Sequence, residues 1–249
     1  MSLIRKSRAG IAARLTATVL TGVLSTTSVP AAGDGEMQSE YMAKPFPLTA
    51  DPDAAPWKDV AGVETSHDRY GKEVPGARTE IRSRWTRRDL YFLFISQYQT
   101  QHLKGQPSKK KETWGLWEYD VVEVFIGWNA LKPRQYKEFE VSPEEDWVDL
   151  DCDRDRKGAE VDWRWDSGFR ARSRVDADRK IWYCEMAIPW KAIDDRQPKE
   201  GNQLRLNLYR IEGAPPNRKY LAWKPVNAES FHTPEAFGQI RLVKPPTKR

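Results

Sequence analysis

Short apolar or alternating segments recur along most of this 249-residue chain, and helical periodicity is almost absent. Residues 90–95 (LYFLFI) and 120–127 (DVVEVFIG) are apolar on both faces, which is typical of central strands in a sheet. An alternating or largely apolar pattern marks the other predicted strands: 77–86, 136–142, 169–175, 181–188, 204–208, 220–223 and 239–243.

About ten short strands separated by turn signals predict an all-β fold. We expect an antiparallel β-sandwich, with a jelly-roll-like or immunoglobulin-like two-sheet architecture. Pro189 ends one strand, and residues 190–193 fit a single helical turn. The expected domain runs over residues 48–246, preceded by a linker or extended lead-in at 32–47, where no periodicity is present.

The first residues have the pattern of an export signal. A basic start is followed by the apolar stretch 15–24 and by small residues at Val29 and Ala31, which together predict a signal peptide over residues 1–31. An amphipathic N-terminal helix or an organelle-type presequence is the alternative. With export, we expect a periplasmic or extracellular protein of bacterial type.

The overall basic charge resides mainly in this predicted signal. Residues 1–31 hold four basic and no acidic residues, so their removal lowers the formal charge from +5 to +1. A nearly neutral chain is a poor match for nucleic acid. No apolar stretch after the signal is long enough to span a bilayer as a helix.

Recognised catalytic motifs are absent from the sequence. The three histidines have no metal-ligand spacing, and there is no P-loop, GxGxxG or GxSxG motif. Cys152 and Cys184 can pair in an oxidising compartment or remain independent thiols, and neither lies in a CxxC motif. No cofactor is required by these patterns.

An acidic run offers hard oxygen ligands for a structural calcium ion. Asp149, Asp151 and Asp153 have DxDxD spacing, but Arg154 replaces the glycine of an EF-hand loop. The alternative is a solvated acidic loop that pairs with nearby arginines.

Aromatic residues give the stronger functional indication. Most of the eleven tryptophans lie in apolar settings typical of a core, but Trp117 lies in a turn directly before an apolar strand. Turn-borne rings at a strand entrance are well placed to stack on a sugar. Asp120, which follows, is expected to be structural, with its carboxylate accepting hydrogen bonds from turn amides.

Five sequence blocks, in order, resemble family 9 carbohydrate-binding modules and their DOMON-like relatives. The blocks are 48–57, 117–126 (WEYDVVEVFI), 182–190 (WYCEMAIPW), 206–210 (LNLYR) and 231–238 (FHTPEAFG). The resemblance covers residues 48–244 and implies a non-catalytic domain that clamps a saccharide between two aromatic rings. Family members are often attached to secreted glycoside hydrolases, which implies such a partner, and they often carry structural calcium.

The resemblance also implies the binding residues. Trp117 and Phe231 take the two aromatic positions, although the second is Trp in better-known members. Glu123 matches a strand carboxylate, and Glu140 stands where sugar-binding members carry a basic residue. The full set of expected carbohydrate-binding residues is Trp117, Glu123, Glu140, Arg210, Phe231 and His232.

Three other functions stay open at this stage. The first is an interaction or structural protein that has lost sugar binding, the second is a hydrolase-associated domain, and the third is a haem-binding DOMON module. The reversed charge at Glu140 favours the first of these, and a haem module needs an axial Met or His pair facing the cleft.

Overall fold

The computed structural model describes residues 36–156 and 163–244, and the signal peptide predicted over residues 1–31 lies outside this part. The all-β prediction is confirmed, because every element longer than four residues is a strand. The elements are β1 (Glu36–Tyr41), β2 (Val63–Thr65), β3 (Thr79–Trp85), β4 (Asp89–Gln97), η1 (Leu116–Glu118), β5 (Val121–Gly127), β6 (Gln135–Val141), β7 (Trp147–Asp153), β8 (Arg170–Asp176), β9 (Ile181–Pro189), α1 (Trp190–Ile193), β10 (Gln203–Glu212), β11 (Lys219–Ala222), η3 (Pro234–Ala236) and β12 (Gly238–Val243).

The strands form one continuous hydrogen-bonded path, which differs from two separate antiparallel sheets. Its order is β7-β6-β5-β10-β12-β1-β3-β4-β9-β8, with β11 paired to β10 and β2 paired to β3. All pairs are antiparallel except those of β1, which runs parallel to both β12 and β3. At the ends of the path, the hydroxyl of Ser173 on β8 donates to the carbonyl of Ser142 at the β6–β7 turn (2.9 Å). The sheet therefore comes close to closing on itself.

Strand β1 lies within the segment predicted as a linker or extended lead-in. Met37 and Ser39 are buried, and the Ser39 hydroxyl accepts a hydrogen bond from Ser83 on β3 (2.9 Å). Because this strand carries only two large apolar side chains, Met37 and Tyr41, its sequence gives little periodic signal. Its pairing depends on two partners that are distant in the sequence.

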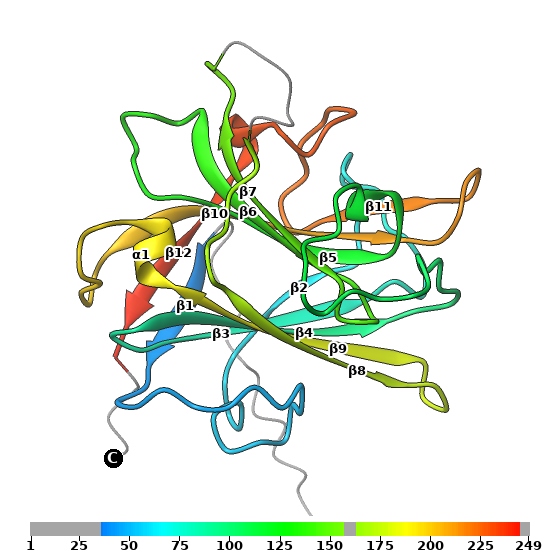
Figure 1. Cartoon of the computed structure of the whole chain (residues 1–249), viewed down its shortest axis with the longest axis horizontal. Helices are drawn as coiled ribbons and strands as arrows, with labels where there is room; N and C mark the ends of the chain where they lie inside the picture. Colours follow the sequence, from blue (N-terminus) through cyan, green and yellow to red (C-terminus); the bar gives the residue numbers. More distant parts are fainter. Residues whose placement is uncertain (1–35, 157–162, 245–249) are drawn as a thin grey trace, which may run out of the picture. The chain divides into compact units, whose positions relative to one another are not determined.

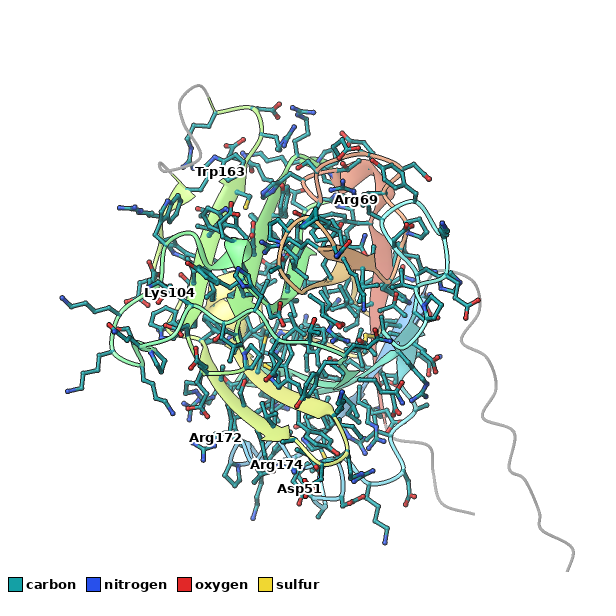
Figure 2. All side chains as sticks on the ribbon, turned by 90° about the vertical axis from the view of Figure 1, so that its right-hand side faces the viewer. Asp51, Arg69, Lys104, Trp163, Arg172 and Arg174 are labelled. Atoms are coloured by element: carbon teal, nitrogen blue, oxygen red, sulfur yellow. The ribbon has the colours of Figure 1, made fainter. Side chains whose placement is uncertain are left out.

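The central core lies between two layers of this sheet, which Figure 1 shows with β5, β6 and β7 in one layer and β3, β4, β9 and β8 in the other. One layer contributes Val124 and Phe139, and the other contributes Phe94 and Ile188, all fully buried. The apolar segments 90–95 and 120–127 thus correspond to β4 and β5, each of which has a paired strand on both sides, as predicted. The arginines of β8 project outward, as Arg172 and Arg174 do in Figure 2.

A second apolar cluster covers the opposite face of β5, β6, β7 and β10. Phe125, Tyr136, Leu150 and Tyr209 are buried there beneath the η1 turn and the segment that leads into η3. Alternation produces both clusters at once, because consecutive side chains of a strand point to opposite faces. The outer face therefore has its own apolar cluster, and the candidate site lies on the same face.

The two cysteines are free and buried. Cys184 belongs to the central core, whereas Cys152 belongs to the cluster on the outer face. The disulfide alternative is therefore not realised. The predicted helical turn is confirmed as α1, and none of the described helices is long and apolar enough to cross a bilayer.

Candidate functional site

A pocket of about 220 Å³ opens on the outer face of β5, β6 and β7. The strands form its floor, while the η1 turn, Trp163 and the segment before η3 form its walls. It is lined by Trp114, Trp117, Glu123, Phe125, Glu138, Glu140, Leu150, Trp163, Ile211, Ser230, Phe231 and His232.

Five of the six sequence-predicted binding residues meet in this pocket: Trp117, Glu123, Glu140, Phe231 and His232. The sixth, Arg210, does not line it. Because Arg210 is in phase with the core-facing leucines of β10, it points to the other side of the strand. There its guanidinium donates to the Gln97 carbonyl (2.6 Å) and pairs with Glu212 (2.6 Å). Arg210 is thus a buried structural cation.

The aromatic walls differ in how firmly they are packed. Trp117 is half-buried, and its ring meets Trp114 edge-on with the centroids 5.0 Å apart. Phe231 is only 8% exposed and stacks on Tyr209 with the centroids 4.1 Å apart. Trp117 therefore offers more free ring surface to a ligand, whereas one face of Phe231 is already covered.

Arg218 holds the turn that carries Trp117. Its guanidinium donates to the backbone carbonyls of Trp117 and Glu118, and to that of Tyr119 at 3.0 Å. The planar fork of arginine suits such a set of acceptors, whereas the point charge of lysine does not. The Arg218 side chain is only 5% exposed, so it fixes the wall from within.

The floor of the pocket is acidic. Glu123 on β5 and Glu140 on β6 are directly opposite each other, and Glu138 lies two residues before Glu140 on the same face. Burial, together with the neighbouring Glu140 charge, raises the pKa of Glu123 well above its usual range. Burial and the charge of Glu138 do the same for the pKa of Glu140. Burial and like charge thus both disfavour the ionised forms of these carboxyls, while the nearby charge of Arg218 acts in the opposite direction.

His232 lies at the junction of the floor and the wall. Its Nδ1 shares a hydrogen bond of 2.6 Å with the Tyr136 hydroxyl, and its Nε2 lies 3.8 Å from the Glu138 carboxylate. Burial lowers the pKa of His232 to about 4, so the ring is neutral at physiological pH. Glu138, Cys152 and His232 each place one ligand atom within 4.8 Å of the others, so these three side chains could hold a metal ion.

The three aspartates expected to bind calcium are not gathered into one site. They alternate along β7 and have separate partners. Asp149 accepts from the backbone amide of Ser167 (3.1 Å), Asp151 pairs with Lys137 (2.6 Å) and Asp153 accepts from Gln135 (3.0 Å). The run therefore lies on strand β7 and not in the solvated, arginine-paired loop of the alternative, and Asp149 is fully buried.

Asp120 has the structural role predicted for it. Its two carboxylate oxygens accept from the backbone amides of His102 (3.1 Å) and Gly213 (2.6 Å), and its own amide donates to the His102 carbonyl (2.9 Å). The side chain is buried and does not line the pocket. It therefore ties the loop before η1 to the end of β10.

The sequence analysis missed seven of the twelve described lining residues, among them Trp114, Glu138 and Trp163. Glu138 shares the strand face of Glu140, so alternation already placed it on the same side. Trp163, labelled in Figure 2, follows the segment after β7 and packs edge-on against His232 with the centroids 5.3 Å apart. Neither its position nor that of Trp114 could be obtained from a local pattern, because both depend on loop paths.

Comparison with known proteins agrees with this fold. The endo-1,4-β-xylanase A of Thermotoga neapolitana is 23% identical over 190 residues, which cover 76% of this chain but only 16% of the xylanase. An extracellular protein of Arthroderma benhamiae is 24% identical over 200 residues, covering 76% of this chain and 87% of that protein.

A solved structure has the same fold at low sequence identity. It is a carbohydrate-binding module of family 9 from Caldicellulosiruptor kristjanssonii in complex with glucose, with a TM-score of 0.59 and 14% identity, over 86% of this chain and 98% of the module. The sequence model of the family described as carbohydrate family 9 binding domain-like matches residues 51–245. The chain therefore belongs to the carbohydrate family 9 binding domain-like family.

Proposed function

We propose that the outer-face pocket binds one sugar residue of a saccharide without catalysing its cleavage. The observation that carries this proposal is the combination of aromatic walls with a carboxyl floor in a single pocket. Ring faces suit the C–H face of a sugar, and carboxyl oxygens suit its hydroxyls. Its volume, about 220 Å³, is below the roughly 300–1,000 Å³ of pockets for drug-sized ligands, which favours one sugar ring.

In this proposal the two predicted aromatic residues have unequal roles. Trp117 supplies the stacking face, because its ring is half-buried and lies on a turn. Phe231 forms the opposite, more rigid wall, since it is already stacked on Tyr209. The saccharide is thus held between the partly exposed ring of Trp117 and the buried ring of Phe231.

Isothermal titration with gluco- and xylo-oligosaccharides tests the proposal. Trp117→Ala should weaken binding of any saccharide that binds the parent by at least about fivefold, given stacking energies on the order of 1 kcal/mol. Trp223→Ala is the matched control, because Trp223 is also half-buried but does not line the pocket. If both variants bind like the parent, the saccharide does not occupy this pocket. If no saccharide binds the parent, the interaction-protein alternative is favoured.

We also propose that the chain is exported and acts beside a secreted glycoside hydrolase. Support comes from the signal pattern at residues 1–31 and from relatives named as an extracellular protein and a xylanase. The intact mass of protein recovered outside the cytoplasm should correspond to a chain that begins after Ala31. A recovered protein that retains Met1 would contradict cleavage of the signal.

A further inference from the structure

Three side chains of different ligand chemistry meet at the floor of the pocket. Glu138 lies on β6 and Cys152 on β7, and they share the outer face because Tyr136, two residues before Glu138, is directly opposite Cys152. His232 comes from the segment between β11 and η3. Glu138 and His232 line the pocket, whereas Cys152 is fully buried. A carboxyl, a thiol and an imidazole thus come together from three separate parts of the fold.

The spacing of these groups fits a small, four-coordinate ion. Oε2 of Glu138 lies 3.4 Å from Sγ of Cys152 and 3.8 Å from Nε2 of His232, and the ligand atoms of the three residues all lie within 4.8 Å of one another. Bond lengths of about 2.0–2.3 Å in a tetrahedral zinc site place neighbouring ligand atoms roughly 3.4–3.6 Å apart. Two separations are already close to that value, so an ion can bind with little movement of the strands.

His232 is oriented for this role by its neighbours. The Tyr136 hydroxyl shares a hydrogen bond of 2.6 Å with Nδ1, and Trp163 packs edge-on against the ring. The other ring nitrogen, Nε2, faces the Glu138 carboxylate. Metal-bound histidines almost always use their second ring nitrogen for a hydrogen bond, which fixes the tautomer and the ring orientation. Tyr136 is therefore a positioning residue for an ion bound at Nε2.

The set of ligand atoms favours zinc over the hard cations. Ca²⁺ and Mg²⁺ take about six or more oxygen ligands, whereas Zn²⁺ binds thiolate, imidazole and carboxylate in four-coordinate sites. The Cys152 thiol gives up its proton to solvent on binding, so the thiolate and the Glu138 carboxylate balance the two positive charges of the ion. Glu138 needs one oxygen for this, and its second oxygen stays available for its other contacts.

We propose that Glu138, Cys152 and His232 bind one zinc ion at the floor of the pocket. Three protein ligands leave one coordination position open, as in zinc sites that also take a water molecule or a ligand. The ion is reached from the pocket, because two of its three ligands line it. This inference goes beyond saccharide binding and does not require it.

Cobalt is the most direct probe, since Co²⁺ replaces Zn²⁺ in tetrahedral sites and absorbs visible light. The full, untagged chain is reduced, stripped with EDTA, freed of the chelator and titrated with Co²⁺. We expect the strong visible absorption of tetrahedral cobalt and a near-ultraviolet thiolate-to-cobalt charge-transfer band, both complete at one equivalent. Zn²⁺ should remove both bands, because it binds such ligands more tightly, whereas excess Ca²⁺ should not. Absence of the thiolate band in the parent chain would overturn the inference without any variant.

Paired variants then locate the ion. Cys152→Ala should abolish the charge-transfer band and weaken Zn²⁺ binding at least about tenfold, which corresponds to about 1.4 kcal/mol. Cys184→Ala removes the other free, buried thiol, which lies in the central core, and should change neither. His232→Ala should weaken Zn²⁺ binding to a similar extent, whereas His67→Ala, which removes an exposed histidine, should not. Thermal melts without metal establish that each variant is folded.

Tyr136→Phe tests positioning separately from ligation. This variant keeps all three ligands but loses the hydrogen bond to Nδ1, so it should retain the charge-transfer band and bind Zn²⁺ about tenfold more weakly. Unchanged affinity would overturn the role assigned to Tyr136.

The outcomes separate this inference from the proposed function, because the titrations use the metal alone. Zn²⁺ binding that survives in both Cys152→Ala and His232→Ala would place the ion elsewhere and overturn the inference, while leaving saccharide binding intact. Conversely, a chain that binds no saccharide but gives the cobalt–thiolate band would support the zinc site and contradict only the proposed function.

Discussion

Glu123 and Glu140 are directly opposite each other on β5 and β6, and both side chains lie on the face that carries the pocket. Opposite residues of an antiparallel pair have Cβ atoms only about 4.5–5.5 Å apart, and like charges in this arrangement destabilise a sheet. The pair therefore lowers the stability of the empty protein at pH values where both carboxyls are ionised. Proteins commonly retain such a cost where a ligand relieves it.

Glu140→Gln should stabilise the ligand-free protein at neutral pH by on the order of 1 kcal/mol, which raises the melting temperature by about 2–4 °C. The folded-state pKa of Glu140 lies above the unfolded value, so the native state binds more protons over this range. Glu140 therefore does not lower the free energy of unfolding below its unfolded-state pKa. The destabilisation develops as pH rises through its folded-state pKa. Melts at pH 4 and pH 7.5 should show a gain only at the higher pH. An equal gain at both would contradict the charge argument.

Asp120→Ala should destabilise the fold by roughly 2–4 kcal/mol, because two backbone amides, of His102 and Gly213, lose a charged acceptor. Asp120→Asn keeps one carbonyl oxygen and should cost clearly less. Urea unfolding of the two variants measures the difference. A loss of saccharide binding with unchanged stability would instead place Asp120 in the binding site.

Arg218→Met should weaken saccharide binding roughly fivefold to tenfold, because the Trp117 turn loses the donors that fix its carbonyls. Arg218→Lys should restore little, since an ammonium cannot reproduce the planar fork. Calorimetry of both variants, with the parent as reference, gives the affinities. Full affinity in the lysine variant would mean that only the charge near Glu123 and Glu140 matters.

Phe231→Ala should lower the free energy of unfolding by about 3 kcal/mol, as expected for a buried Phe, since its ring is 8% exposed and stacked on Tyr209. Trp117→Ala should cost less stability, because its ring is half-buried. Chemical denaturation compares the two directly. A larger loss at Trp117 than at Phe231 would make Trp117 part of the core and remove it as a stacking wall.

Strand alternation predicted much of this site. It placed Glu123 with Phe125 and Glu140 with Tyr136 on one face, and it also put Arg210 in phase with the core-facing leucines. The resemblance to family 9 nevertheless suggested Arg210 as a binding residue. It matches positions along a strand, but it does not say on which face of the sheet a side chain lies in this chain. The structure resolves this conflict in favour of the alternation.

Other features depend on contacts that no local pattern contains. Trp163 lies in the pocket beside residues that are distant from it in the sequence, and Arg218 acts on a turn that lies a hundred residues earlier. The parallel pairing of β1 is equally non-local, because its partners are β3 and the last strand. Such long-range pairings decide the topology, whereas the periodicity of each segment decides only its type.

The position of β1 between β12 and β3 has a consequence for anyone who isolates this domain. A fragment that begins at residue 48, where the sequence predicts that the domain starts, would lack β1 and leave two open edges in the middle of the sheet. Unpaired edges of that length are templates for pairing with other molecules. Such a fragment should aggregate or exchange strands, whereas one that begins before Glu36 keeps the path continuous.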